Sequence, residues 1–94
     1  MPPRTAAALA ALDDLLASLK GLPSGADMDR VIADAEALRR AVASFHMEAI
    51  RFRMYSVDRD LKTLGDDPAV RQLYENVRQA LETAGFHTRS HTAP

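Results

Sequence analysis

The chain has 94 residues, a formal net charge of −1 and an apolar fraction of 47 %. This length fits one domain, and the apolar fraction is that of a folded protein rather than a disordered one. The absence of cysteine excludes disulfides, thiolate metal sites and cysteine nucleophiles. No stretch has the pattern of a signal peptide or a membrane span, so we expect a soluble, cytoplasmic protein.

The first predicted helix runs from about Ala6 to Lys20. Leucines recur along it at helical spacing and form one apolar stripe. Gly21 is expected to adopt the left-handed conformation that ends many helices, with Leu22 folding back onto the last turn. The next three residues, 23–25, are Pro-Ser-Gly and predict a turn.

The segment from Ala26 to Leu64 contains no glycine and no proline, and its apolar residues keep helical spacing throughout. This pattern predicts one continuous helix roughly 55 Å long, whereas a compact monomer of this size has a radius of gyration of about 12 to 13 Å. A lone chain would leave much of such a helix uncovered. The alternative is a break near Ser44 or Ser56 that gives a compact four-helix monomer, although neither position has the Gly or Pro that usually accompanies a sharp kink.

Two apolar seams follow this segment, and the second is displaced around the helix from the first. The first seam includes Val31 and Leu38, and the second includes Val57 and Leu61. Where the seams overlap, little purely polar surface remains, which predicts burial on nearly all sides. The residues predicted to form a self-association core are Val42, Phe45, Ala49, Ile50, Phe52 and Met54.

The last predicted helix begins at Pro68, after an Asp N-cap, and runs to about Ala84. We therefore predict an all-α fold of three helices, short, long and short, in a single domain over residues 1–86. Residues 87–94 are predicted to form a flexible polar tail. Because each short helix can cover only half of the long one, a helical-bundle homodimer is the expected assembly.

Charge is unevenly distributed along the chain. Residues 1–38 carry three positive and six negative side chains, whereas residues 39–64 carry six positive and three negative ones. Such a gradient is compatible with antiparallel alignment of two copies and equally with a solvated surface that has no partner. Nucleic acid is not an expected partner, because Glu48, Asp58 and Asp60 interrupt the basic cluster. The arginines predicted to contact a protein partner are Arg39, Arg40, Arg51 and Arg53.

The middle of the predicted long helix holds the densest mixture of aromatic and ionisable residues. His46 and Arg53 are seven residues apart on one helix face, so a twofold assembly would bring two of each around a small anionic ligand. In the simpler interpretation, both residues only border the dimer interface. The predicted ligand-binding set is His46, Glu48, Arg53 and Tyr55.

Motifs of catalysis or metal binding are missing from the sequence. There is no nucleophile elbow, phosphate-binding Gly loop or dinucleotide fingerprint. His87 and His91 have the spacing of a chelating pair, but they follow Gly85, which ends the last predicted helix. We expect no cofactor and no metal, and these absences favour a protein that is not an enzyme without deciding the question. The predicted function is a small helical interaction module, such as an adaptor, scaffold component or regulatory subunit, that self-associates. The alternative is a ligand-binding protein or small enzyme with its site between protomers.

Overall fold

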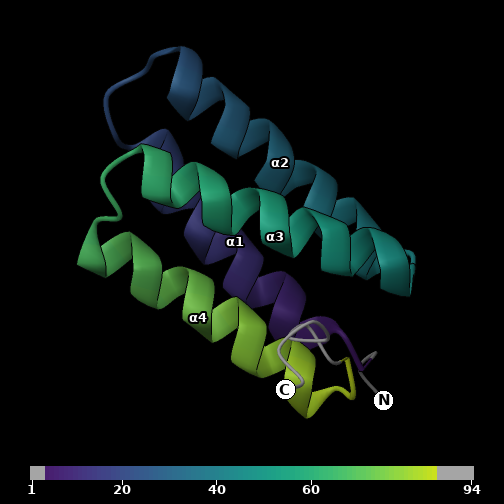
Figure 1. Cartoon of the computed structure of the whole chain (residues 1–94). Coiled ribbons are helices and arrows are strands. Elements are labelled where there is room, and N and C mark those ends of the chain that lie inside the picture. Colours follow the sequence, from purple (N-terminus) through teal and green to yellow (C-terminus); the bar gives the residue numbers. More distant parts are fainter. Residues whose placement is uncertain (1–3, 87–94) are drawn as a thin grey trace, which may run out of the picture.

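The computed structural model describes residues 4–86, and over this range the chain is all-helical. Its helices are α1 (Ala6–Lys20), α2 (Ala26–Ala43), α3 (Met47–Thr63) and α4 (Pro68–Thr83). The prediction of three helices is therefore wrong, because the segment expected to form one long helix consists of α2 and α3, which run antiparallel (Figure 1). The chain adopts the alternative break near Ser44.

The break between α2 and α3 is a Schellman motif, in which two backbone N–H groups close the end of a helix. Phe45 adopts the left-handed conformation, with a φ of 60°. Its N–H donates to the carbonyl of Val42 at 3.2 Å, and the N–H of His46 donates to the carbonyl of Ala41 at 3.0 Å. His46 then caps α3, because its Nδ1 accepts a hydrogen bond from the N–H of Ala49 at 3.2 Å.

The same pair of hydrogen bonds ends α3 and α4, with the left-handed Gly65 and Gly85 in the place of Phe45. Asp66, which follows Gly65, also has a positive φ, of 54°. Phe45 thus occupies the position that glycine takes at the ends of α3 and α4, so the absence of Gly and Pro between Ala26 and Leu64 does not reveal this break. Gly21, which was expected to be left-handed, has a φ of −85°. The expected closure of α1 is therefore wrong, and Leu22 remains 41 % exposed instead of folding back.

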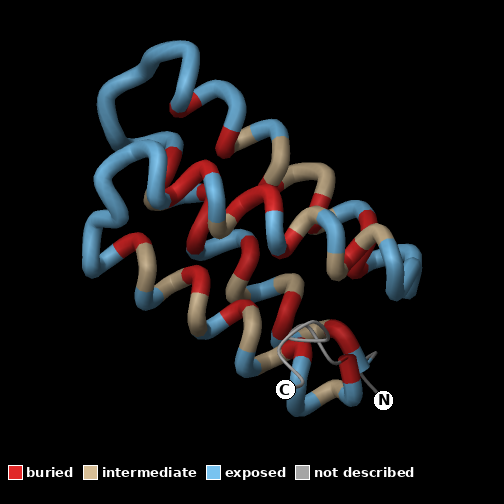
Figure 2. Tube along the Cα trace, viewed as in Figure 1, coloured by how far each residue is buried: buried red, intermediate tan, exposed pale blue. Residues whose placement is uncertain are grey.

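The four helices enclose one core of buried apolar side chains (Figure 2). Contacts are most extensive between α2 and α3 and between α1 and α4, and among the pairs of helices in contact they are least extensive between α3 and α4. The radius of gyration is 12.6 Å, the value expected of a compact monomer. The length of the predicted helix therefore no longer argues for a second copy. The largest fully buried side chains are Leu12, Leu15, Leu19, Val31, Leu38, Val42, Ile50, Met54, Val57, Val77 and Leu81.

Ion pairs connect neighbouring helices at the edge of this core. Arg39 of α2 donates from Nε to Oδ1 of Asp13 in α1 at 2.7 Å, and this hydrogen bond lowers the pKa of Asp13. Arg71 of α4 donates from Nη1 to Oδ1 of Asp58 in α3 at 2.6 Å. Burial alone would raise the pKa of Asp58, but hydrogen bonds from Arg71 and Lys62 outweigh it and lower that pKa.

Among the described helices, none is both long enough and apolar enough to cross a membrane. The predicted tail at residues 87–94, with His87 and His91, lies outside the described residues.

Candidate functional site

The outward side of α3 carries a stripe of four exposed side chains. At about 100° per residue, Glu48, Phe52, Tyr55 and Arg59 fall within roughly 60° of one another, opposite the buried residues of the helix. Phe52 is 58 % exposed and Tyr55 is 59 % exposed, the highest values among the large apolar side chains of residues 4–86. We call these four residues the α3 stripe.

An arginine accompanies each ring of the α3 stripe. The guanidinium carbon of Arg53 lies 5.1 Å from the ring centroid of Phe52, and that of Arg59 lies 5.9 Å from the ring centroid of Tyr55. These separations allow cation–π attraction. Aromatic residues and arginine are enriched at protein interfaces. Tyrosine and arginine are also among the residues whose removal most often weakens binding. The stripe therefore has the composition of a protein-binding surface.

The six residues predicted for self-association do not form one surface in the single chain. Phe45 and Phe52 are exposed, whereas the other four belong to the core or its edge. Phe45 is also partly covered, because its ring packs against that of Phe86 with centroids 5.3 Å apart. Phe52 is thus the most accessible member of the predicted set. The four members in or beside the core are Val42, Ile50, Met54 and Ala49.

The predicted ligand-binding residues divide into two groups. Glu48 and Tyr55 lie on the α3 stripe. His46 is the N-cap of α3, and Arg53 donates from Nη1 to Oδ1 of Asp34 in α2 at 3.1 Å. The structure therefore does not bring these four side chains together within one chain, and a ligand site between protomers stays a prediction.

Two of the predicted partner-contact arginines are engaged within the chain, since Arg39 pairs with Asp13 and Arg53 with Asp34. Within residues 4–86, Arg40 and Arg51 form no ion pair, and the buried Nε of Arg51 has no hydrogen-bond partner. Arg59, which lies on the α3 stripe, is absent from the predicted set. Its position four residues after Tyr55 is the signal that would have found it.

A second polar cluster lies between α2 and α3, where Asp34 and Asp60 form a carboxyl pair. The side chain of Asp60 is 4 % exposed, and its Oδ2 has no hydrogen-bond partner among residues 4–86. Burial, followed by the neighbouring carboxyl of Asp34, raises the pKa of Asp60 to about 6. Arg53 pairs with Asp34 at 3.1 Å, and Arg59 lies 3.8 Å from Asp60. In the sequence, Asp60 is recognisable only as an acidic residue that interrupts the basic cluster, and its burial beside Asp34 depends on the pairing of α2 with α3.

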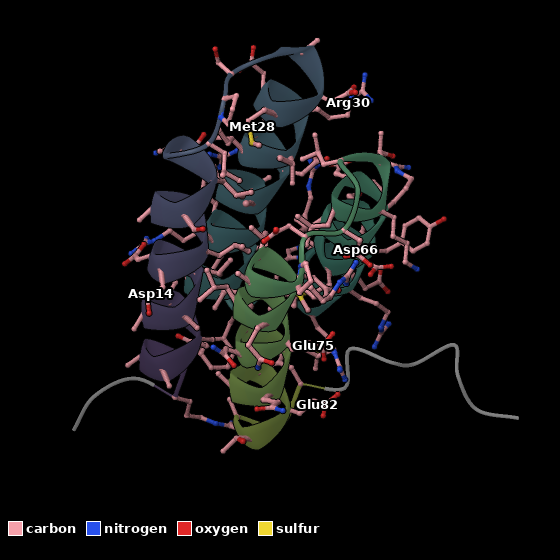
Figure 3. The ribbon with its side chains drawn as sticks, turned by 90° about the vertical axis from the view of Figure 1, so that its left-hand side faces the viewer. Asp14, Met28, Arg30, Asp66, Glu75 and Glu82 are labelled. Atoms are coloured by element: carbon pink, nitrogen blue, oxygen red, sulfur yellow. The ribbon has the colours of Figure 1, made fainter. Side chains whose placement is uncertain are left out.

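An apolar hollow of about 250 Å³ opens at the end of the fold where the α1–α2 and α3–α4 connections meet. Figure 3 shows Met28 of α2 pointing toward α1 at this end. The ionisable residue in its lining is Asp67, whose Oδ2 accepts from the N–H of Val70 as the N-cap of α4. The hollow therefore offers apolar surface without several converging polar groups, unlike most ligand sites.

In the part of the chain that the structure describes, no three His, Asp or Glu side chains are grouped so that they could hold a metal ion. No family model, curated protein or solved structure matches this chain. Over residues 4–86, the fold and the surface together define an all-α arrangement of four helices with an exposed stripe of aromatic and charged residues on α3.

Proposed function

We propose that this protein is a small helical interaction module, an adaptor, scaffold component or regulatory subunit that acts by presenting the α3 stripe to another protein. The observation that carries the proposal is the exposure of Phe52 and Tyr55 on a helix whose opposite side is buried. Fully burying a large apolar side chain stabilises a complex by about 1.5 to 3 kcal/mol. A partner that covers both rings would therefore gain a substantial part of its binding free energy from them.

The α3 stripe rests on a helix that several contacts hold in place. Arg53 connects α3 to Asp34 of α2, and the hydroxyl of Tyr74 in α4 donates to the carbonyl of Met54 at 3.0 Å. The Asp34 contact also fixes the guanidinium that lies beside the ring of Phe52. A surface that is ordered before binding loses less conformational entropy on association, which supports its use as a docking site.

Self-association is part of this proposal, but its basis differs from the prediction made from helix length. In the described fold, α2 and α3 cover each other within one chain, so the core needs no second copy. The rings of Phe52 and Tyr55 are the apolar surface that association would cover.

The proposal is tested by placing the photo-crosslinking residue p-benzoylphenylalanine at Tyr55 in cells of the protein's own host. A light-dependent crosslinked species is expected at this position and is expected to disappear when Phe52→Asp is added. The matched control places the same residue at Gln79, an exposed position on α4. Equal crosslinking at both positions, or no crosslink at Tyr55, would contradict an interaction through the α3 stripe.

A further inference from the structure

The α3 stripe has a symmetric order of side chains. Glu48 precedes Phe52 by four residues, and Arg59 follows Tyr55 by four residues. In an antiparallel pair of α3 helices, a register that sets Phe52 opposite Tyr55 of a second copy also sets Glu48 opposite Arg59 of that copy. In this register each acidic side chain of the stripe faces a basic one and each ring faces a ring. The stripe is therefore complementary to a second copy of itself in charge and in apolar surface.

We propose that the occupant of the α3 stripe is a second copy of this chain, packed antiparallel about a twofold axis between Phe52 and Tyr55. This inference rests on the proposed function, because it names the partner of the same surface. A twofold axis repeats each contact, which gives two ring pairs at the centre and two Glu48–Arg59 pairs at the ends. The charged ends are about 16 Å apart along the helix axis.

The charges of the stripe select this partner and this direction. Within residues 4–86, Glu48 forms no ion pair, and the one ion pair of Arg59 is a 3.8 Å contact with Asp60. The guanidinium of Arg59 also lies beside the ring of Tyr55, on the same stripe. Both side chains therefore have charge available for a partner. A parallel pair would set Glu48 against Glu48 and Arg59 against Arg59, which is repulsive. An apolar centre between charged ends is also the usual layout of a protein interface.

The arrangement is tested with two charge-reversal variants, Glu48→Arg and Arg59→Glu, examined by native mass spectrometry alone and mixed. Each variant alone sets like charges against each other twice, so its homodimer is expected to weaken about tenfold. In the mixture, one chain carries two basic and the other two acidic stripe residues, so the heterodimer is expected to exceed the roughly half share of random pairing. The two substitutions change the mass in opposite directions, which separates the three dimers.

The double variant Glu48→Arg with Arg59→Glu restores both charge pairs with reversed polarity. Its homodimer is expected to recover to within about threefold of the original affinity, and circular dichroism of every variant checks that the helices form. A monomeric wild-type chain at all concentrations, a mixture with random pairing, or a double variant as weak as the single ones would overturn the twofold arrangement. If a crosslink at Tyr55 then captures a protein of different mass, the interaction module stands and the second copy as its partner does not.

Discussion

The ring of Phe45, in the corner between α2 and α3, packs against the ring of Phe86, with centroids 5.3 Å apart and planes tilted by 48°. Phe86 follows the left-handed Gly85 at the end of α4, and Phe45 is itself the left-handed residue at the end of α2. Two helix ends that are 41 residues apart in sequence thus meet through aromatic side chains. A tilted pair of rings contributes about 0.5 to 1.5 kcal/mol beyond its buried area, which offsets the unfavourable backbone of Phe45.

The left-handed conformation of Phe45 predicts which of two substitutions at this position gives the more stable protein. The left-handed region costs a non-glycine residue about 1 to 2 kcal/mol, so we expect Phe45→Gly to be about 1 kcal/mol more stable than Phe45→Ala. Both variants lack the ring, so their difference reports the backbone alone. In a continuous helix, Ala would instead be favoured over Gly by about 1 kcal/mol. Urea denaturation of both variants measures the difference, and greater stability of the Ala variant would contradict the corner.

Gly65 provides an independent control for this interpretation. Its φ is 100°, and a methyl group added there would meet no atom within 4 Å. We expect Gly65→Ala to lower the free energy of unfolding by about 1 kcal/mol through backbone conformation alone. Gly21 has ordinary helical backbone, and there Gly→Ala is expected to be neutral or stabilising by about 0.4 to 1 kcal/mol. The same sign at both positions would contradict the described helix ends.

The carboxyl pair of Asp34 and Asp60 predicts an unusual dependence of stability on pH. The pKa of Asp60 is raised from 3.8 to about 6 in the folded chain. The folded state therefore binds the proton more tightly, and the resulting stability is fully present below about pH 4 and lost as pH rises through 6. We expect the free energy of unfolding to be about 1 kcal/mol higher at pH 5 than at pH 7.5.

The matched variant for this prediction is Asp60→Asn, which imitates the neutral carboxyl. It is expected to be more stable than the wild type at pH 7.5 and to lose the gain on acidification. Guanidinium denaturation at the two pH values measures both effects. A variant that is less stable at pH 7.5 and retains the pH dependence would show that Asp60 is not the titrating group.

Phe52 and Ile50 lie two residues apart on opposite sides of α3. Substituting each by Asp distinguishes an effect on association from an effect on folding. Phe52 is 58 % exposed, whereas Ile50 is fully buried. At concentrations where the chain is monomeric, Phe52→Asp is expected to change the free energy of unfolding by no more than about 0.5 kcal/mol. Ile50→Asp is expected to unfold the chain, because it buries an unpaired carboxylate. Thermal melts followed by circular dichroism distinguish these outcomes, and unfolding by Phe52→Asp would contradict the described exposure.

The hydroxyl of Tyr74 joins α4 to α3 through its hydrogen bond to the carbonyl of Met54. Burial raises the pKa of Tyr74 to about 12, so its phenol remains neutral well above pH 10. We expect Tyr74→Phe to cost about 1 kcal/mol of stability and to remove the tyrosinate absorbance step near pH 12. Tyr55→Phe, at an exposed position, is the control and is expected to change stability by less than about 0.5 kcal/mol. Equal costs would show that the buried hydrogen bond contributes nothing.

The two apolar seams of the central segment indicate the break between α2 and α3 better than the absence of glycine does. The second seam consists of Ile50, Met54, Val57, Leu61 and Leu64. Its first four members form the buried side of α3, whereas Leu64 follows the helix and is exposed. The displacement of this seam from the first marks the start of a new helix after Phe45. The spacing of apolar residues indicates which side of a helix is buried. It does not by itself reveal a break between two helices when the connection is as short as the one at Phe45, because the helical spacing resumes directly after it.

The sequence by itself determined the all-helical class, the bounds of α1 and the start of α4, because apolar spacing, capping residues and turn residues act locally. Only the tertiary structure decided that residues 26–64 fold back as α2 and α3, because the left-handed cost at Phe45 is offset by a ring that lies 41 residues away. The same fold-back buried Ile50 and Met54 within one chain and left Phe52 and Tyr55 outside. Which side chains are buried depends on which helices pack against each other, and local sequence patterns do not determine that packing.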